Sequence, residues 1–370
     1  MGSWGGEWRV AWRRWRNRTI GSAAFQRHAA ANPLLRPVVR RHASALFDLG
    51  AGFIYAQTAL ALVESGLLAA LAGRELGVEE AASLADLSPA STRTLLRAAA
   101  ALKLVEPVGG NRWALAVRGA ALAGNPGALA MFAHHRLLYA DLADPLKMLR
   151  EGGGRLAGLW SYTAEADPKD VAAYSQLMAS SQPMVAEQAL AAYNFGVHRR
   201  MLDIGGGQGA FARHINAAAP ALDITIFDLP AVLGSAGEGP AGAPHQFADR
   251  IAFHAGDFRS EPLPGGFDLI TLVRVLHDHD DPVAARLLAA IHAVLPPQGR
   301  LLIIEPMAGT PGAERAGDAY FGMYLAAMGS GRSRRPDEIK TMLRETGFSR
   351  AKLLFTPVPL IARALIAHRD

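Results

Sequence analysis

Met201-Leu-Asp203-Ile-Gly205-Gly206-Gly207-Gln-Gly209-Ala210 is the stretch that decides the fold of this chain. Apolar residues typical of a strand end in an acid, and glycines, which have no Cβ, then allow a tight turn into a helix that begins near Ala210. Such a turn lets a ligand lie against bare backbone. Gly205, Gly207 and Ala210 also fit the dinucleotide pattern G-x-G-x-x-G/A, with Asp228 in the place of a ribose-binding acid, so this stretch alone leaves the nucleoside open.

Strands and helices alternate beyond Arg200, which predicts a mainly parallel sheet covered by helices on both faces. In such a sheet, ligands lie outside the carboxyl ends of the strands. The expected strands are 201–204, 223–227, 251–254, 267–273 and 300–305, with a closing pair at 351–357 and 360–367, and the expected helices are 209–218, 283–294 and 335–346.

The residues that follow the strands suit a nucleoside without phosphate. Asp228 can accept both ribose hydroxyls, while Asp257 and Phe258 offer an acceptor for an exocyclic amine and a flat apolar face for a purine. Pyrophosphate would need free N–H groups, yet the acid Asp203 directly precedes the glycine turn and suits an ammonium group better. S-adenosylmethionine, which has an ammonium group and no phosphate, therefore matches these residues better than a nicotinamide dinucleotide.

The chain resembles the S-adenosylmethionine-dependent O-methyltransferases of the plant caffeate and bacterial acetylserotonin type. The motifs that carry the resemblance are Asp203-Ile-Gly-Gly-Gly-Gln-Gly209, Phe227-Asp-Leu-Pro230, Gly256-Asp-Phe258, Val275-Leu-His-Asp278 and Ile304-Glu-Pro306. They lie within residues 200–350, and residues 45–115 resemble that family's dimerisation domain. The resemblance implies an α/β fold, a Rossmann-like methyltransferase sheet with an N-terminal helical winged-helix domain, and a homodimer.

The resemblance also implies roles for individual residues. His277 would be the general base, because a histidine with a pKa of about 6.5 can take the acceptor's proton at neutral pH, and Glu305 would orient its imidazole. Relatives place a second glutamate where this chain has Ser333, so the orienting pair is incomplete unless Asp278 or another group substitutes. The implied cofactor-binding residues are Asp203, Gly205, Gly207, Asp228, Leu229, Asp257, Phe258 and Arg274.

The run His277-Asp278-His279-Asp280-Asp281 has two further interpretations. Asp280 or Asp281 can cap the helix that begins near Pro282. The run could also bind a divalent metal, but its two histidines cannot share one face of a helix and no carboxylates at i+4 spacing converge with them. We therefore expect no metal.

The front part of the chain predicts a winged helix, with helices at 78–85 and 89–102 and strands at 104–107 and 112–115. Ser88 before Pro89 is a good N-cap. This arrangement raises a DNA-binding regulator as an alternative function. The candidate recognition helix carries only Arg93 and Arg97, which is poor material for neutralising phosphates, so no nucleic-acid partner is expected.

The leader of the chain is rich in arginine and tryptophan at helical spacing. Such a segment suits a lipid headgroup interface, but it could equally be a solvated arm that packs on the protein or on a second subunit. A helix over 53–71 follows, and Gln57 and Glu64 make the stretch 51–72 a buried helix rather than a membrane span. The residues that define the leader are Trp4, Trp8, Trp12 and Trp15 with Arg9, Arg13, Arg14, Arg16, Arg18, Arg27, Arg36, Arg40 and Arg41.

Composition bounds the remaining questions. The chain has no cysteine, hence no disulfide framework, and the cytoplasm is the default compartment, at the inner membrane surface if the leader touches lipid. The net charge of +5 comes with arginines concentrated in the leader. The expected division is a leader 1–44, a winged-helix dimerisation domain 45–115, a helical connector and pocket wall 116–195, and a catalytic domain 196–370.

The acceptor is expected to be apolar and hydroxylated. Methionine, histidine and aromatic residues suit the wall of such a pocket, although each alone is more often ordinary core. General likeness to the bacterial methyltransferases of hydroxyneurosporene and demethylspheroidene, carried by 45–53, 141–145, 159–162 and 328–334, predicts a carotenoid, with a small phenol or polyketide as the alternative. The predicted pocket residues are Met131, His135, Tyr139, Trp160, Met178, Met184, Tyr324 and Met328.

Overall fold

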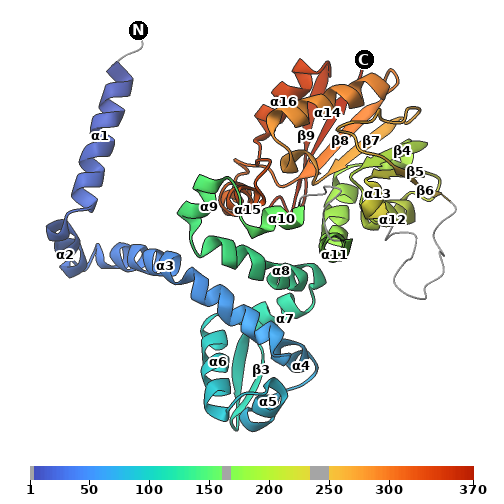
Figure 1. Cartoon of the computed structure of the whole chain (residues 1–370). Helices are drawn as coiled ribbons and strands as arrows, with labels where there is room; N and C mark the ends of the chain where they lie inside the picture. The colour runs from blue at the N-terminus through green and yellow to red at the C-terminus, as the bar shows by residue number, and fades with distance from the viewer. Residues whose placement is uncertain (1–3, 161–167, 234–249) are drawn as a thin grey trace. The chain divides into compact units, whose positions relative to one another are not determined.

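The computed structural model describes residues 4–160, 168–233 and 250–370. The chain divides into two compact units, Met1–Ala123 and Gly124–Asp370, and each is described by itself (Figure 1). The finer division into four segments stays a prediction.

The first unit contains a winged helix and a set of N-terminal helices. Its elements are α1 (Trp4–Ile20), α2 (Ala23–Ala31), α3 (Arg36–Glu64), α4 (Leu67–Gly73), β1 (Leu76–Gly77), α5 (Val78–Ala85), α6 (Pro89–Ala101), β2 (Val105–Gly109), β3 (Arg112–Leu115) and α7 (Val117–Ala123). The three strands form an antiparallel sheet in the order β1-β3-β2. Ser91 N donates to Ser88 Oγ over 3.1 Å, so the predicted cap of α6 is present.

The apolar stretch expected as one buried helix over 53–71 is divided and only partly buried. α3 ends at Glu64, and Gly66 with φ +75° precedes α4, because a left-handed residue cannot continue a right-handed helix. Leu60 is buried, but Phe53 is 65% exposed, so the expectation of burial is wrong for that part of α3. By length and composition α3 could span a membrane, and 17% of its most apolar window is buried.

A seven-stranded sheet organises the second unit. The strands are β4 (Arg200–Ile204), β5 (Asp223–Asp228), β6 (Ile251–Ala255), β7 (Leu269–Val273), β8 (Arg300–Glu305), β9 (Arg350–Leu354) and β10 (Arg363–His368). Their order is β6-β5-β4-β7-β8-β10-β9, and only β10 runs antiparallel to its neighbours. The strand order reverses between β4 and β7, the place where sheets of this kind bind ligands.

Two apolar cores cover the two faces of the sheet, as the sequence predicts. Along β8, Leu301 and Ile303 join one core and Leu302 and Ile304 join the other, because side chains of a strand alternate between faces. Helices α14 (Asp281–Val294) and α16 (Pro336–Glu345) cover the first face, and α11 (Pro168–Ala192) and α12 (Ala210–Ala218) cover the second. The predicted Rossmann-like fold is confirmed (Figure 1).

A third apolar cluster lies among helices of the second unit that flank the sheet. It includes Leu138 of α8 (Pro126–Leu142), Met148 of α9 (Pro145–Glu151) and Leu156 of α10 (Arg155–Trp160). They pack with α15 (Phe321–Met328), which a π-helical turn, η3 (Arg315–Tyr320), precedes. Such turns recur near functional sites, and this one places Tyr320 directly before α15.

Candidate active site

A cavity of about 750 Å³ opens at the carboxyl ends of β4, β5 and β7, within the second unit. The glycine turn after β4 forms one wall, and side chains from α8, α11 and α15 form the opposite wall. The cavity therefore lies where the strand order reverses, the place that the sequence predicts.

The glycine turn brings bare backbone to the cavity. Gly205 and Gly207 have φ of +69° and +58°, which residues with a Cβ rarely adopt. A Cβ on Gly205 would lie 2.6 Å from Val275 Cγ2, whereas one on Gly207 would meet nothing within 4 Å. Gly205 is therefore required for packing, and Gly207 leaves room for a ligand beside the backbone.

Asp203 does not line this cavity. It is fully buried beneath the turn, where a Cβ on Gly206 would lie 2.6 Å from its Oδ2, and Thr271 Oγ1 donates to its Oδ1 over 2.6 Å. Burial raises the pKa of Asp203 to about 7. The expectation that this acid meets an ammonium group directly is therefore not supported: its position supports the turn instead.

Asp228 closes the turn from the end of β5. Gly207 N donates to its Oδ2 and Leu229 N donates to its Oδ1, each over 2.7 Å. Burial raises the pKa of Asp228, and the two backbone donors act in the opposite direction. Both Asp228 and Leu229 line the cavity, so the structure brings these predicted residues to the glycine turn.

Asp257 and Phe258 line the cavity beyond β6. Arg259 Nε and Nη2 donate hydrogen bonds of 2.8 to 3.1 Å to the Asp257 carboxylate, and these hydrogen bonds lower the pKa of Asp257. The ring of Phe258 meets His279 edge-on, with ring centroids 5.2 Å apart. Arg259 was not foreseen as the partner of Asp257, although it stands only two residues away in the sequence.

Arg274 follows β7 in a left-handed conformation, with φ +55°. Its Nη1 donates to Ser181 Oγ of α11 over 2.8 Å, and its backbone N–H donates to Ile304 O. A non-glycine residue in this region stores backbone strain, which clusters at functional sites. The strain places a positive charge on the cavity wall.

His277 lies on a short 3-10 turn, η2 (Leu276–Asp278), and is only 4% exposed. Its backbone N–H donates to Glu305 Oε2 over 3.0 Å, and its Nε2 lies 3.2 Å from Asp278 Oδ1. Glu305 thus holds the backbone of His277, and among the described residues its Oε1 and the His277 Nδ1 have no hydrogen-bond partner. His277 and Asp278 line the cavity, while Glu305 lies behind it.

Burial governs the charge of these three groups. It lowers the pKa of His277 to about 3, with the positive charge of Arg274 acting in the same direction. It raises the pKa of Glu305 to about 7, and it raises the pKa of Asp278 well above its ordinary value. The shifts favour neutral forms, so the His277 imidazole is unprotonated at neutral pH, and its pKa lies below the value of about 6.5 assumed from the sequence.

The helix expected near Pro282 begins as predicted, with Asp280 at the N-cap of α14. The side chain of Asp280 makes no cap hydrogen bond with the helix and instead accepts from Gly331 N over 3.0 Å. Asp281 pairs with Arg332 and Arg334. The predicted side-chain cap is therefore wrong, because residues about fifty positions later take both carboxylates.

Two histidine-tyrosine pairs line the other wall. His134 Nε2 bonds Tyr324 OH, and His135 Nε2 bonds Tyr320 OH, each over 2.8 Å. Burial lowers the pKa of His134 to about 4 and raises that of Tyr320 above its ordinary value. Tyr320 was missed from the sequence, although its i, i+4 spacing from Tyr324 could have indicated that the two share a helix face.

The other predicted pocket residues divide into three groups. Met131 and Met184 line the cavity. Tyr139 packs edge-on against His135 with ring centroids 6.0 Å apart, and Met328 is buried in the third apolar cluster, so neither forms the wall. The side chains of Trp160 and Met178 lie outside the described residues. Within the described ranges no group of three or more His, Asp or Glu could hold a metal ion.

Comparison with known proteins assigns the chain to a family. An O-methyltransferase domain matches residues 139–349. The demethylspheroidene O-methyltransferase of Rhodobacter capsulatus is 44% identical over 91% of this chain and 85% of that protein. The chain belongs to the O-methyltransferase family. It is an enzyme that transfers the methyl group of S-adenosylmethionine to oxygen.

Two further relatives support this membership. The demethylspheroidene O-methyltransferase of Cereibacter sphaeroides is 41% identical over 95% of this O-methyltransferase and 94% of that protein. The structure of human N-acetylserotonin methyltransferase in complex with S-adenosylmethionine has a TM-score of 0.74 at 26% identity, covering 89% of this chain and 98% of that one.

The cavity fits the cofactor of this O-methyltransferase. Gly207 leaves open space beside the backbone, and the carboxylate of Asp228 lies at the end of β5, the position at which sheets of this kind bind a ribose. Phe258 offers an aromatic face on the same wall. These features match a nucleoside cofactor without phosphate, as expected from the sequence.

Proposed function

We propose that this O-methyltransferase methylates a hydroxyl group of a carotenoid. The observation that carries the proposal is the identity of 44% and 41%, over nearly the whole chain, with two demethylspheroidene O-methyltransferases. The mostly apolar wall of the cavity, with Met131 and Met184, supports an apolar acceptor. Demethylspheroidene is therefore the first acceptor to test.

In the proposed reaction, Asp228 binds the ribose of the cofactor, and the turn at Gly205 and Gly207 holds its amino-acid end. S-adenosylmethionine supplies an electrophilic methyl group, and the protein supplies alignment and a proton acceptor. Phe258 faces the purine. Asp257 accepts a hydrogen bond from the exocyclic amine, beside Arg259, which donates to the same carboxylate. Arg274 contributes a positive charge to the cavity wall.

His277 accepts the proton of the acceptor hydroxyl as that oxygen attacks. Its Nε2–H donates to Asp278 Oδ1, so Nδ1 carries the lone pair that takes the proton, and the same oxygen continues to accept from the imidazolium that forms. Glu305 acts from behind by holding the His277 backbone. Asp278 is thus the substitute for the glutamate that relatives place at the position of Ser333.

The test of this function is transfer of labelled methyl from S-adenosylmethionine to a panel of acceptors, with product detected by chromatography. Methylation of demethylspheroidene supports the proposal. Turnover restricted to small phenols would refute the carotenoid acceptor and leave the O-methyltransferase activity in place. Salt-sensitive binding of DNA without turnover would favour the regulator instead.

A small phenolic acceptor is the second candidate. The two histidine-tyrosine pairs make part of the wall polar, which suits an acceptor with several polar groups. The acetylserotonin O-methyltransferase of Mus musculus molossinus is 30% identical over 84% of both chains. The same acceptor panel separates the two candidates, and acetylserotonin is its phenolic-type member.

The exposed apolar face of α3 supports a homodimer. Leu46, Leu49 and Phe53, at i, i+3 and i+7 spacing on one face, are 71%, 82% and 65% exposed in the single chain. Burial against the same face of a second copy would remove them from water. Light scattering tests this, and replacing Leu49 and Phe53 with glutamate is expected to give a monomer.

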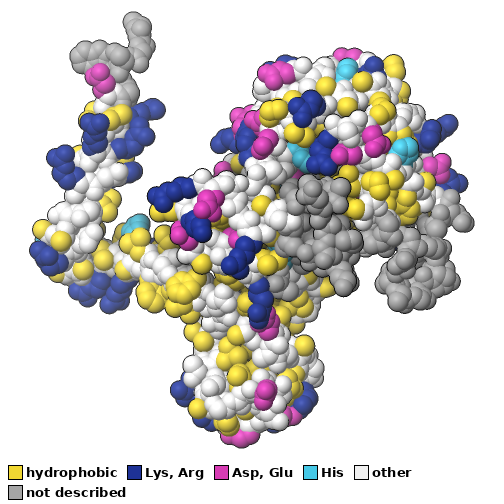
Figure 2. All heavy atoms as spheres, viewed as in Figure 1, with side chains coloured by type: hydrophobic (Ala, Val, Ile, Leu, Met, Phe, Trp, Pro, Cys, Tyr) yellow, Lys and Arg dark blue, Asp and Glu magenta, His cyan; other side chains and the backbone are white. Residues whose placement is uncertain are grey.

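The leader helix supports contact with the inner membrane surface from the cytoplasm. Trp8, Trp12 and Trp15 are 69%, 44% and 64% exposed, and arginines gather along α1 and at the start of α3 (Figure 2). This composition suits a helix lying at anionic headgroups. Co-sedimentation with phosphatidylglycerol vesicles tests it, and binding that is equal with and without the leader would refute it.

A further inference from the structure

Four consecutive backbone carbonyls around the proposed base accept hydrogen bonds from one distant segment. Arg334 Nη1 donates to Leu276 O over 2.8 Å and Arg334 Nη2 donates to His279 O over 2.7 Å. Between them, the backbone N–H of Arg332 donates to His277 O over 2.9 Å and Ser330 Oγ donates to Asp278 O over 3.0 Å. We call residues 330–334 the clamp segment.

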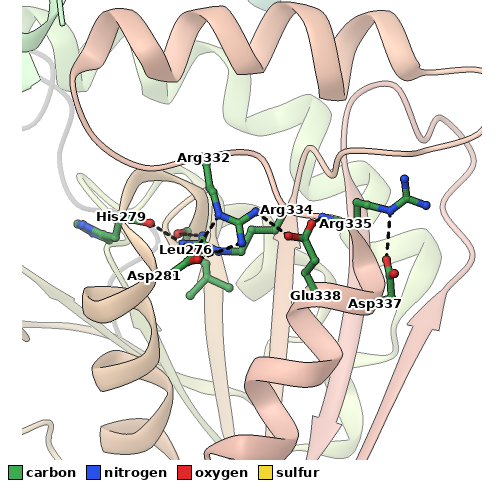
Figure 3. A network of polar contacts seen from close by, with 8 residues as sticks. All are labelled: Leu276, His279, Asp281, Arg332, Arg334, Arg335, Asp337 and Glu338. Carbon is green, nitrogen blue, oxygen red and sulfur yellow. Dashed lines mark hydrogen bonds and ion pairs between the residues drawn. The ribbon is translucent and has the colours of Figure 1, made fainter. Parts of the chain in front are cut away.

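Arg334 is the centre of this arrangement (Figure 3). Its side chain is fully buried, and its Nε and Nη2 also donate to Asp281 Oδ1 over 3.0 and 2.7 Å. A buried guanidinium is costly unless its donors are paired, and here its planar fork reaches two carbonyls and one carboxylate at once. The two carbonyls belong to Leu276 and His279, on either side of His277.

The backbone of the clamp segment is shaped for this contact. Gly331 has φ +77°, and a Cβ there would lie 2.2 Å from His277 O. Arg334 O accepts from Ala308 N over 3.0 Å, which ties the segment to the chain that follows β8 and Glu305. The clamp segment, the loop with His277 and the end of β8 are therefore joined by hydrogen bonds.

The clamp segment does not act on the imidazole through Ser333. Ser333 Oγ is buried and, within the described part of the chain, has no hydrogen-bond partner. Ser333, at the position where the family resemblance expects a glutamate, therefore makes no side-chain hydrogen bond in the described part of the chain. Arg334, one residue later, makes four. The contacts run to the backbone of the loop and not to the His277 ring.

We propose that Arg334 is a positioning residue for His277. Arg334 holds the backbone carbonyls on both sides of the base and so sets where the imidazole meets the acceptor hydroxyl. The inference rests on the proposed role of His277 as general base.

The first experiment compares Arg334→Lys and Arg334→Met with Arg335→Gln. Arg335 is the matched control, because it is adjacent and its exposed side chain pairs with Asp337. Both Arg334 variants are expected to lose kcat by roughly 100-fold, the cost of a misplacement near 1 Å, while KM and the Kd of S-adenosylmethionine stay near wild type. Wild-type kcat in a folded Arg334→Lys protein would overturn the proposal.

The pH profile separates positioning from simple loss of stability. Groups facing His277 include Asp278, Glu305, Arg274, His279 and Arg334, and the positive charge of Arg334 contributes to the lowered pKa of His277. Arg334→Met removes that charge, so the pKa of His277 rises and activity falls at a higher pH on the acid side. Arg334→Lys keeps the charge, so it lowers kcat while the acid side of the pH–activity profile moves less.

Two milder variants decide the matter if both Arg334 variants fail to fold. Ser330→Ala removes the donor to Asp278 O, and Asp281→Asn weakens the anchor of the guanidinium. Each is expected to lower kcat several-fold with little change in melting temperature. Wild-type kcat in both would contradict the clamp.

The histidine resonances give a readout that needs no acceptor. In wild-type enzyme with ¹³C-labelled histidine, NMR titration follows His277, which is assigned with His277→Gln. Changed ring resonances of His277 in Arg334→Lys, which keeps the positive charge, with none in Arg335→Gln, support the proposal even if the acceptor is a phenol and the carotenoid proposal fails. Unchanged His277 ring resonances in folded Arg334→Lys would overturn it.

Discussion

The two sides of the cavity are constructed differently. On the cofactor side, Gly207 and Leu229 donate to Asp228, so residues of two consecutive strand ends hold one another through backbone groups. On the base side, His277 depends on Glu305 and Arg334, which lie 28 or more residues further along the chain. The base side therefore depends on residues further along the chain than those that close the glycine turn.

The largest expected effect tests the base side. His277→Ala removes the proton acceptor, and kcat is expected to fall by about 10²- to 10⁴-fold, the usual contribution of general-base catalysis. The Kd of S-adenosylmethionine should stay near wild type because the two sides are built separately. Turnover near wild type would show that His277 is not the base, and a large loss of cofactor affinity would show that the sides are coupled.

Asp228→Ala tests the cofactor side in the same way. It removes a carboxylate that is expected to bind the ribose and that accepts from Gly207 N. Affinity for S-adenosylmethionine, measured by calorimetry, is expected to fall by about 10- to 100-fold, the range of a hydrogen bond to a charged group. Asp228→Asn keeps an acceptor and should lose less. Equal affinity in all three proteins would exclude ribose recognition by Asp228.

Asp203→Asn sharpens the comparison through pH. The pKa of Asp203 is about 7 in the folded chain against an ordinary 3.8, so its contribution to stability is full below pH 4 and is lost as pH rises towards 7. The variant lacks this titration. Its melting temperature should therefore gain on wild type between pH 4 and 7, by a few degrees for each ~1 kcal/mol. A difference in melting temperature that stays constant across this pH range would contradict the raised pKa of Asp203.

Arg259→Ala is expected to have the smallest effect. Its ion pair with Asp257 is partly exposed, and such pairs contribute about 0 to 1 kcal/mol. Removing it frees the Asp257 carboxylate, so the Kd of S-adenosylmethionine should change by less than about fivefold. A larger loss of affinity would show that Arg259, and not Asp257 alone, contacts the cofactor.

Much of this enzyme could be predicted because its signals are local. The glycine turn, the polar residues after each strand and the alternation of strands with helices are short-range patterns, and they led to the sheet, the cavity and the O-methyltransferase family. The break at Gly66 was missed because apolar periodicity continues across it, while its φ of +75° is a property of the folded backbone. The exposure of Phe53 was missed because composition cannot reveal what remains without a partner.

The sequence by itself determined which residues stand at the strand ends, since a turn or a strand end depends on residues a few positions apart. Only the tertiary structure decided what those residues touch. It placed Asp203 beneath the turn, turned Glu305 to the backbone of His277, and brought Arg334 to a loop 55 to 58 residues earlier. The physical reason is that hydrogen bonds between distant segments form only when packing of the sheet and helices brings their donors and acceptors together.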